Sequence, residues 1–291
     1  MYIKNILAQQ FEWSPTAQQD EVFGLLAEFL HIFSRECCFI LKGYAGTGKT
    51  TIISALVNAL PRLQKRSVLL APTGRAAKVM SAYSGRRALT IHKKIYRKKN
   101  AASLQMDFDI AENLHENTLF IVDEASMIST EEFNLYSNGL LADLIQYVQA
   151  GQNCTLMLVG DTAQLPPVGL DYSPALDIAY INSTFNLQVM TYEMTDVVRQ
   201  DKGSGILFNA TKIRNEIKLD EDSPTYSFPK FITQGFVDIF RMNGDRLIEG
   251  LHYAYDKYDI ENCMVICRSN KSANLYNKHI RNQILFREEE I

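Results

Sequence analysis

Long hydrophobic runs are absent from the sequence, and this absence excludes a protein with membrane-spanning helices. None of the apolar stretches in the 291 residues approaches the roughly 20 residues that a helix needs to cross a bilayer. The first residues, MYIKNILAQQFEW, also lack the apolar core and the cleavage site of a secretory signal. We therefore expect a cytoplasmic chain that does not enter a membrane.

Cysteine pairs of the kind that hold zinc are also missing. The cysteines are Cys37, Cys38, Cys154, Cys263 and Cys267. They form no C-x-x-C pair, and no histidine lies at ligand spacing from them, so a zinc site is not indicated. Buried, reduced thiols are the expected state.

The sequence has no excess of positive charge, since 30 Lys and Arg stand against 33 Asp and Glu, for a formal net charge of −3. The distribution is nevertheless uneven, because residues 75–99 contain many Lys and Arg and no Asp or Glu. Charges act within about 8–10 Å in physiological salt, so a local basic face on an acidic chain can still bind phosphate. A solvated surface helix is the alternative, and charge alone leaves the choice open.

The order of apolar and amphipathic segments indicates the fold class. Apolar runs typical of buried strands occupy residues 37–42, 67–71, 118–123 and 154–160, and helical patterns occupy residues 52–60, 75–83 and 131–149. Continuous apolar strands between helices predict an α/β fold with a parallel sheet covered on both faces. Ligands of such a sheet bind at the carboxyl ends of its strands.

A second α/β unit is predicted from about residue 195 onward. Compositional breaks at Gly203 and at residues 223–229 precede it. Apolar runs at residues 236–240 and 263–267, on either side of a helical pattern at residues 246–258, resume the alternation. Two strands are too few for a complete sheet of the usual five or six.

A glycine-rich motif carries the clearest chemistry. Residues 43–50, GYAGTGKT, match the whole G-x-x-x-x-G-K-[ST] pattern between a predicted strand and a predicted helix. Its glycines let backbone N–H groups surround the β- and γ-phosphates of a nucleotide, and the helix N-terminus adds partial positive charge. The candidate nucleotide-binding residues are Gly43, Ala45, Gly46, Thr47, Gly48, Lys49, Thr50 and Thr51. Lys49 is expected to bridge phosphate oxygens and Thr50 to bind Mg²⁺, whereas a glycine-rich turn with an accidental lysine is the alternative.

Polar residues after the next two predicted strands complete this site. Asp123 follows an apolar run and is the candidate second ligand of Mg²⁺. Glu124 beside it is suited to deprotonate the attacking water. Gln164, in GDTAQLPPV, can hydrogen-bond the γ-phosphate or that water, although a proline-terminated strand end and a surface turn are the alternative for this segment.

These motifs, in this order, resemble superfamily 1 DNA helicases of the 5′-to-3′ branch, the RecD-like and Dda-like group, over nearly the whole chain. The matching segments are SPTAQQ (14–19), GYAGTGKTT (43–51), APTGRAA (71–77), TIH (90–92), VDEAS (122–126), GDTAQLPPVG (160–169) and DVVRQ (196–200). The resemblance implies a RecA-like P-loop NTPase sheet followed by a partial second RecA-like domain. It also implies ATP and Mg²⁺ as cofactors and single-stranded DNA as the partner.

The resemblance assigns roles to further residues. Gln19 is implied to read adenine, with the adjacent Gln18 as the other register. Arg199 is implied to contact the γ-phosphate, and an interdomain salt bridge is its alternative. Residues implied to contact the DNA backbone are Pro72, Thr73, Arg75, Thr90, His92, Asn270 and Lys271. For the last two, capping of a helix by Ser269 or Asn270 stays open, and His92 can also be structural.

The resemblance also implies the domain order. Residues 1–195 correspond to the first RecA-like domain, with a small pin insertion at about residues 98–117, and residues 196–291 to the N-terminal part of the second. Met106 or Phe108 is either the strand-separating wedge or the core of the insertion's own hairpin. The later motifs V and VI of the family have no counterpart, so we expect the chain to be part of a longer protein.

The sequence supports one leading function and keeps others open. The leading hypothesis is a monomeric, ATP-dependent helicase or translocase motor that acts 5′-to-3′ on single-stranded DNA. The alternatives are a motor subunit of a nuclease–helicase complex and a non-hydrolysing ATP-binding module that contacts DNA or protein. A ring-forming ATPase of the AAA type is less favoured, because a glutamine occupies the sensor position.

Overall fold

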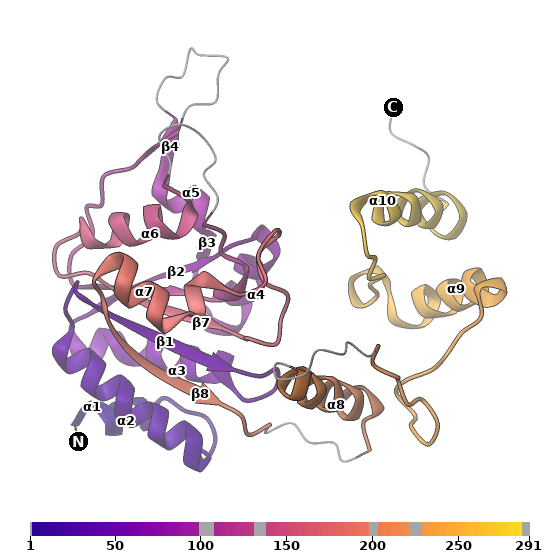
Figure 1. Cartoon of the computed structure of the whole chain (residues 1–291), viewed down its shortest axis with the longest axis horizontal. Helices are drawn as coiled ribbons and strands as arrows, with labels where there is room; N and C mark the ends of the chain where they lie inside the picture. The colour runs from indigo at the N-terminus through magenta and orange to yellow at the C-terminus, as the bar shows by residue number, and fades with distance from the viewer. Residues whose placement is uncertain (1, 99–107, 131–137, 198–202, 221–227, 287–291) are drawn as a thin grey trace. The chain divides into compact units, whose positions relative to one another are not determined.

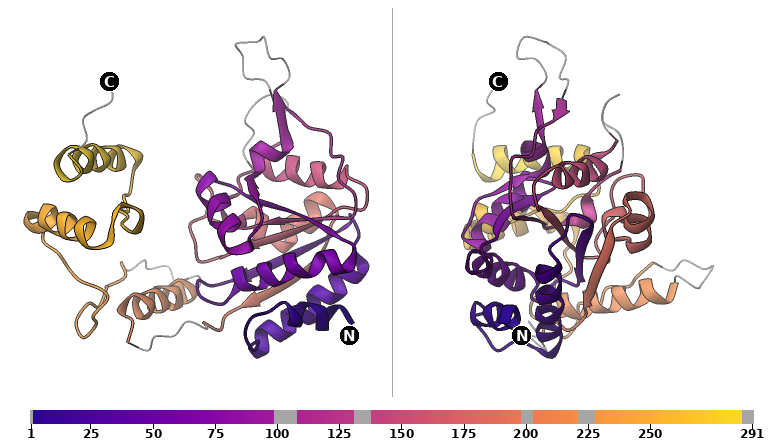
Figure 2. Two further views of the ribbon diagram at one scale, coloured as in Figure 1. Left: turned by 180° about the vertical axis from the view of Figure 1, so that it is seen from behind. Right: turned by 90° about the vertical axis from the view of Figure 1, so that its left-hand side faces the viewer.

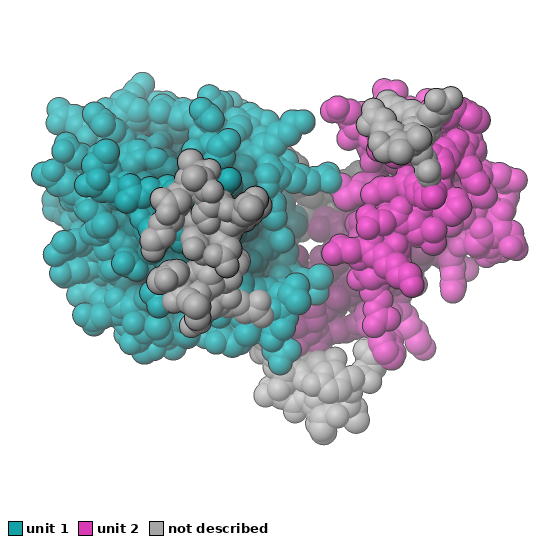
Figure 3. Space-filling model, turned by 90° about the horizontal axis from the view of Figure 1, so that it is seen from above, with its two compact units in different colours: residues 1–200 teal, residues 201–291 magenta. Residues whose placement is uncertain are grey.

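The computed structural model describes residues 2–98, 108–130, 138–197, 203–220 and 228–286. The chain divides into two compact units, residues 1–200 and residues 201–291, which Figure 3 colours separately. The first unit contains the sheet and all the motifs up to residue 197. Among the described residues, no helix combines the length and the apolarity needed to span a membrane.

The first unit is built on a six-stranded sheet in which every pair of neighbours is parallel, which confirms the predicted fold class (Figure 1). Its order is β3-β2-β6-β7-β1-β8. In that order the strands are β3 (Ala88–Thr90), β2 (Arg66–Ala71), β6 (Thr118–Val122), β7 (Thr155–Gly160), β1 (Cys37–Gly43) and β8 (Gln188–Met194). The four predicted strands all form, within one residue of their expected ends.

Helices cover both faces of the sheet (Figures 1 and 2). One face carries α1 (Tyr2–Gln9), α2 (Ala17–Ile32), α3 (Lys49–Ala59) and α4 (Gly74–Ser84), and the other carries α5 (Ile91–Ile95), α6 (Leu140–Gln149) and α7 (Ile178–Phe185). Short 3₁₀ turns lie at Leu60–Leu63, Ala125–Met127 and Pro174–Leu176. Alternate residues of β1 explain the two cores, because Phe39 and Leu41 join the first and Cys38 and Ile40 join the second.

A two-stranded antiparallel ribbon stands apart from the main sheet, where the sequence indicated a small hairpin. β4 (Tyr96–Lys98) pairs with β5 (Phe108–Ile110), so Lys98 lies opposite Phe108. The hydroxyl of Tyr96 donates to Oδ2 of the buried Asp143 on α6 at 2.7 Å, which ties the base of the ribbon to the core. Phe108 is 36% exposed, and Met106 lies outside the described residues.

The regular elements of the second unit, in its described residues, are all helices and helical turns. It consists of α8 (Gly205–Asp220), α9 (Leu247–Tyr258) and α10 (Asn270–His279), with 3₁₀ turns at Gly244–Arg246 and Ile260–Asn262 and a π-helical turn at Ile280–Ile284. The predicted helix at residues 246–258 is confirmed as α9.

The predicted strands at residues 236–240 and 263–267 are wrong, since neither segment pairs with another in the described part of the unit. Their apolar side chains suggested burial, yet Val237 and Ile266 are 85% and 89% exposed. Asp238 instead caps α8 by accepting the Gly205 backbone N–H at 2.7 Å and the Ser204 hydroxyl at 2.6 Å. The segment lies against a helix end, and the described part of this unit offers no strand with which its backbone could form a ladder.

The cysteines differ between the two units. Cys37, Cys38 and Cys154 are buried and free, as expected, whereas Cys263 and Cys267 are partly exposed, so the expectation of burial is wrong for this pair. The predicted strand at residues 263–267 does not form, so no sheet among the described residues covers the backbone around these two cysteines.

Candidate nucleotide-binding site

Apart from SPTAQQ, which leads into α2, the motifs of the first unit lie at the carboxyl ends of strands. The P-loop follows β1, residues 71–77 follow β2, residues 90–92 follow β3, Asp123 follows β6 and residues 160–169 follow β7. Parallel strands present these ends at one edge of the sheet, so the loops meet there. Because β6, β7 and β1 are neighbours, the P-loop, Gln164 and the two acids gather, while β2 and β3 lie toward the far end of the same edge.

The P-loop leaves a helix N-terminus without a side-chain cap. Gly48 is the N-cap residue of α3 and has no side chain with which to cap the first turn. The N–H groups of that turn therefore match an anion such as phosphate. The Lys49 ammonium group donates to the carbonyl oxygens of Gly43 at 2.5 Å and Tyr44 at 2.9 Å, so it lies over the loop.

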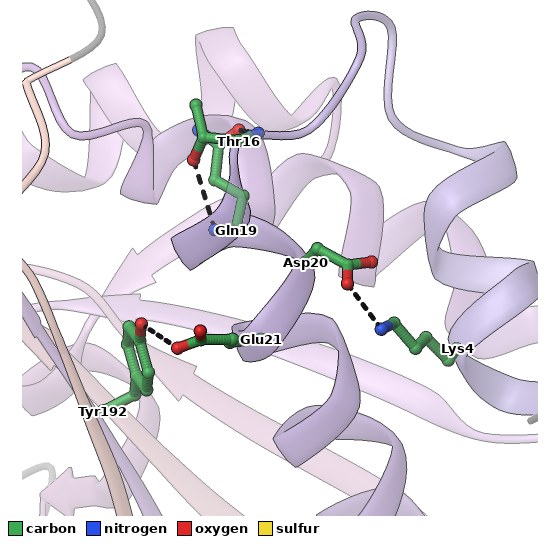
Figure 4. Close-up of polar contacts among 6 residues, drawn as sticks. All are labelled: Lys4, Thr16, Gln19, Asp20, Glu21 and Tyr192. Atoms are coloured by element: carbon green, nitrogen blue, oxygen red, sulfur yellow. Dashed lines mark hydrogen bonds and ion pairs between the residues drawn. The ribbon is translucent and has the colours of Figure 1, made fainter.

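Gln19 packs directly against this loop. It is 4% exposed, its Nε2 donates to the Thr47 carbonyl at 3.3 Å, and its Oε1 accepts the Thr16 backbone N–H at 3.0 Å. Thr16 Oγ1 accepts the Gln19 N–H in return, which forms a capping box at the start of α2 (Figure 4). The structure thus places Gln19 beside the P-loop by fixing the first turn of its helix.

The neighbouring Gln18 points elsewhere. Its Oε1 accepts the backbone N–H groups of Thr195 at 2.9 Å and Asp196 at 3.0 Å, just after β8. Between the two possible registers of the motif, the geometry therefore puts Gln19 at the nucleotide cavity and Gln18 on the segment that leads toward Arg199. Arg199 itself lies outside the described residues.

Side chains of α2 are also bonded to both of its neighbours (Figure 4). Asp20 pairs with Lys4 of α1 at 2.7 Å, and Glu21 accepts the Tyr192 hydroxyl of β8 at 2.5 Å. These contacts hold the first turn of α2, and with it Gln19, in place against the sheet.

A side chain is poorly tolerated at Gly48. Its φ is +93°, and a Cβ there would lie 2.5 Å from Gln19 Nε2. We predict that Gly48→Ala lowers stability by about 1–2 kcal/mol from the backbone conformation alone and weakens nucleotide binding by displacing Gln19. Thermal melting and nucleotide titration measure the two effects.

Gly24→Ala is the matched control for that substitution. Gly24 lies inside α2 with nothing within 4 Å of an added Cβ. Alanine there should raise stability by about 0.5–1 kcal/mol and leave nucleotide binding unchanged. Equal binding by the Gly48→Ala and Gly24→Ala variants would contradict the role given to the loop.

The Asp123 carboxylate is held by a donor on each of its oxygens. Asp123 Oδ1 accepts the Glu124 backbone N–H at 2.9 Å, and Oδ2 accepts the Tyr83 hydroxyl from α4 at 2.7 Å. Glu124 has a φ of 55°, a left-handed conformation that is uncommon for this residue type and is often found at functional sites.

The electrostatic surroundings of Glu124 suit a proton acceptor. Burial raises the pKa of its carboxyl group, and the charge of Asp123 raises it further. Lys49 and a hydrogen bond with Gln164 act in the opposite direction. Burial and the nearby Asp123 likewise raise the pKa of the Tyr83 hydroxyl. Gln164, which the sequence predicts to hydrogen-bond the γ-phosphate or the attacking water, thus lies against Glu124.

A cavity of about 610 Å³ brings the site together. The predicted residues that line it are Gln19, Ala45, Gly46, Gly48, Lys49, Thr50, Thr51, Asp123, Glu124 and Gln164. Gly43 and Thr47 are not part of the cavity lining. A Cβ on Gly43 would meet Met194, and Thr47 is fully buried.

Sequence reasoning missed part of the cavity wall. Phe11, Trp13, Ser14 and Tyr44 also line it. Ser14 and Tyr44 belong to quoted motifs but were given no role. Phe11 and Trp13 carry no motif of their own, so only their position just ahead of SPTAQQ could have pointed to them.

The residues present fit a nucleoside triphosphate with its metal ion. The uncapped helix and Lys49 match the phosphates, and the aromatic wall offers a surface for a base. The Thr50 hydroxyl and the Asp123 carboxylate, both on the cavity wall, are oxygen ligands of the kind that Mg²⁺ takes alongside phosphate oxygens.

The predicted DNA-contact residues of the first unit lie around the starts of α4 and α5. Thr73 and Thr90 are the N-cap residues, accepting the N–H groups of Ala76 and Lys93, both at 3.2 Å. Arg75 and His92 are exposed, and Pro72 is half-buried. Desolvation of the His92 ring by its neighbours lowers its pKa. A capping hydroxyl keeps its own proton, so either threonine can still donate to phosphate.

In the second unit the capping question is resolved in favour of Ser269. Its hydroxyl oxygen accepts the Ser272 N–H at 3.2 Å and so caps α10. Asn270 and Lys271 follow in the first turn, and both are exposed.

The fold and the site define a P-loop nucleotide-binding protein. The chain belongs to the AAA domain family, whose model matches residues 27–221. The match covers most of the first unit and extends through α8 of the second.

Similar proteins confirm the resemblance found in the motifs. The chain is 27% identical over 253 residues to the ATP-dependent DNA helicase dda of Enterobacteria phage T4, across 84% of this chain and 52% of that protein. It is 32% identical over 154 residues to the ATP-dependent RecD2 DNA helicase of Deinococcus radiodurans, across 51% of this chain and 18% of that protein. The chain thus spans about half the length of the first relative and less of the second.

Among solved structures, Pif1 helicase from Candida albicans is similar at 17% identity with a TM-score of 0.49. That similarity covers 94% of this chain and 55% of the other.

Proposed function

We propose that this chain is the nucleotide-hydrolysing part of a DNA helicase or translocase that moves 5′-to-3′ along single-stranded DNA as a monomer. The observation that carries the proposal is the shared sheet edge. The P-loop, Asp123 and Glu124 form a nucleotide site at one part of this edge, and the exposed basic segment of α4 and α5 continues it beyond β2 and β3. The named relatives, both ATP-dependent DNA helicases, support the choice of ATP and DNA.

The side chains of the site divide the chemistry among them. Lys49 balances the charge of the phosphates, and Thr50 and Asp123 hold Mg²⁺, which neutralises phosphate oxygens when bound. Glu124 accepts a proton from the attacking water, and Gln164, against Glu124, orients that water. We assign to Arg199 the stabilisation of charge on the transferred phosphoryl group. Gln19 is assigned to the adenine.

The basic face is proposed to bind the strand through its phosphates. Arg75, Lys78, Arg86, Arg87 and Lys93 are all exposed in this part of the unit. Contacts to phosphates fix the position of a strand without reading its sequence, which is what a motor that moves along DNA requires. Asn270 and Lys271 on α10 are proposed as additional phosphate contacts.

Neutralising two of these charges tests the DNA face. We expect the double variant Arg75→Gln/Lys78→Gln to weaken binding of oligothymidine, with the slope of log K against log salt reduced by about 1.4, that is about 0.7 for each lost phosphate contact to a single strand. Fluorescence anisotropy over a salt series measures this slope. Arg62→Gln, on the 3₁₀ turn after α3, is the control and should leave the slope unchanged. An unchanged slope in the double variant would exclude this face.

The direct test of the function is ATP hydrolysis by this chain with and without single-stranded DNA. Trp13, the sole tryptophan, lines the cavity, so its fluorescence follows nucleotide binding independently of turnover. Stimulation of turnover by DNA is the expected result. Nucleotide binding with no turnover on any nucleic acid would contradict the motor and favour a non-hydrolysing binding module. A constant partner on purification from the native host would favour a nuclease–helicase complex.

A further inference from the structure

A tyrosine outside every recognised motif links the proposed DNA face to the proposed metal ligand. Tyr83 lies in the last turn of α4, and its hydroxyl donates to Asp123 Oδ2 at 2.7 Å. Asp123 stands at the end of β6, so the bond joins two elements that are 40 residues apart in the chain. Nothing in the P-loop mechanism calls for a tyrosine at this place.

The bond fixes the orientation of the Asp123 carboxylate. Oδ1 is held by the Glu124 backbone N–H and Oδ2 by Tyr83, while the Asp123 backbone N–H donates to the Leu70 carbonyl at 3.0 Å. Each carboxylate oxygen has two lone pairs, so one on each oxygen remains available for a metal ion or its water. Tyr83 therefore holds the ligand in a fixed direction without occupying all of its binding capacity.

The other end of α4 carries the candidate DNA contacts. Thr73 caps this helix, Arg75 and Lys78 are exposed along its first turns, and the helix spans 11 residues. With a rise of about 1.5 Å per residue, such a helix is a rod of about 16 Å. We therefore expect a shift of its first turn on binding a strand to be carried to Tyr83.

Contacts around Tyr83 tie this rod to the neighbouring elements. The Tyr83 carbonyl accepts the Ser54 hydroxyl of α3, the helix that begins at Lys49, at 3.3 Å. Ser81 Oγ accepts the Ala88 N–H at 2.8 Å, which attaches the start of β3 to the same helix. The carboxyl-terminal part of α4 is thus connected to both segments proposed to contact DNA. It reaches residues 72–75 through the helix itself and residues 90–92 through β3.

We propose that Tyr83 is a positioning residue that couples a DNA strand on α4 to the orientation of the Asp123 carboxylate, and so to metal-dependent nucleotide binding. The proposal rests on the function proposed above and names the contact through which the two halves of the site communicate. It predicts a linkage: a bound strand lowers the Mg²⁺ concentration needed for nucleotide binding, and this effect depends on the Tyr83 hydroxyl.

The test measures that linkage without requiring turnover. Binding of the non-hydrolysable analogue AMP-PNP is followed by calorimetry over a series of Mg²⁺ concentrations, with and without a short oligothymidine. In the wild-type chain we expect the oligothymidine to lower the half-saturating Mg²⁺ concentration by about fivefold or more, the lower end of ordinary coupling between sites. In Tyr83→Phe, which keeps the ring packed against the core, we expect a change of less than about twofold.

Tyr253→Phe is the matched control, because the Tyr253 hydroxyl also bonds to a charged side chain, accepting from Lys257 on α9 at 2.8 Å, but lies in the second unit, outside the site. It should retain the full shift, and thermal melting of both variants checks that the fold is intact. Equal shifts in the wild type and Tyr83→Phe, or no shift in a wild-type chain that binds both ligands, would overturn the coupling. Failure of the wild type to bind AMP-PNP or oligothymidine would refute the proposed function itself and remove the basis of the coupling with it.

Discussion

Replacing Lys49 by alanine should abolish measurable ATP turnover and weaken nucleotide binding. The Lys49 ammonium group lies over the P-loop, bonded to the Gly43 and Tyr44 carbonyl oxygens, where it can reach the phosphates. Without it, negative charge that develops on the phosphoryl oxygens loses a fixed cation. Loss of one such electrostatic contact typically lowers the rate about 100- to 1000-fold.

The measurement combines turnover with Trp13 fluorescence, so that binding and chemistry are separated. Lys257→Ala is the control, because Lys257 lies on α9 in the second unit, where it bonds to Tyr253. The control should hydrolyse ATP like the wild type. Normal turnover by Lys49→Ala would show that the activity resides elsewhere or comes from a contaminant.

The central strands of the sheet could be predicted from sequence because burial on both faces leaves a continuous apolar run. β6 and β7 are buried at every residue, and their predicted bounds agree with the structure within one residue. The edge strands carry a weaker signal. β3 has three residues, and β8, QVMTYEM, is mostly half-buried, so neither shows the uninterrupted apolar pattern.

The second unit shows where the same signal misleads. Apolar runs at residues 236–240 and 263–267 predicted strands, but an apolar run states only that a segment favours burial, whereas a strand also needs a partner for its backbone. In the described residues, Asp238 turns its segment into a helix cap, and Ile266 stays exposed. The sequence alone does not specify which partner is present.

The site was predictable to the extent that its chemistry is local in sequence. Lys49, Thr50, Asp123, Glu124 and Gln164 belong to short motifs after strands, and the structure brings them to one cavity. Trp13 and Tyr83 belong to no motif, since they reach the site through the packing of α2 and α4. Contacts of this kind follow from tertiary structure, and a single sequence gives no signal for them.

Glu124→Gln should separate nucleotide binding from hydrolysis. Glutamine has nearly the same shape and can keep a hydrogen bond with Gln164, but its amide cannot accept the proton of the attacking water. Asp123 stays bonded to Tyr83 and to the backbone of residue 124, so the metal ligand is retained. We therefore expect binding, followed by Trp13 fluorescence, to change little.

The rate of hydrolysis by Glu124→Gln should fall about 100-fold or more, within the range that a positioned general base contributes. Glu28→Gln, on the exposed side of α2, removes the same charge away from the site and should hydrolyse ATP normally. Both variants lose one carboxylate, but only Glu124 lines the cavity. Comparing their rates therefore separates the loss of a general base from a general effect of lost charge. Hydrolysis by Glu124→Gln at the wild-type rate would show that another group takes the proton. Because Asp123 is bonded to Tyr83 and assigned to the metal ion, the roles of both acids would then have to be reassigned.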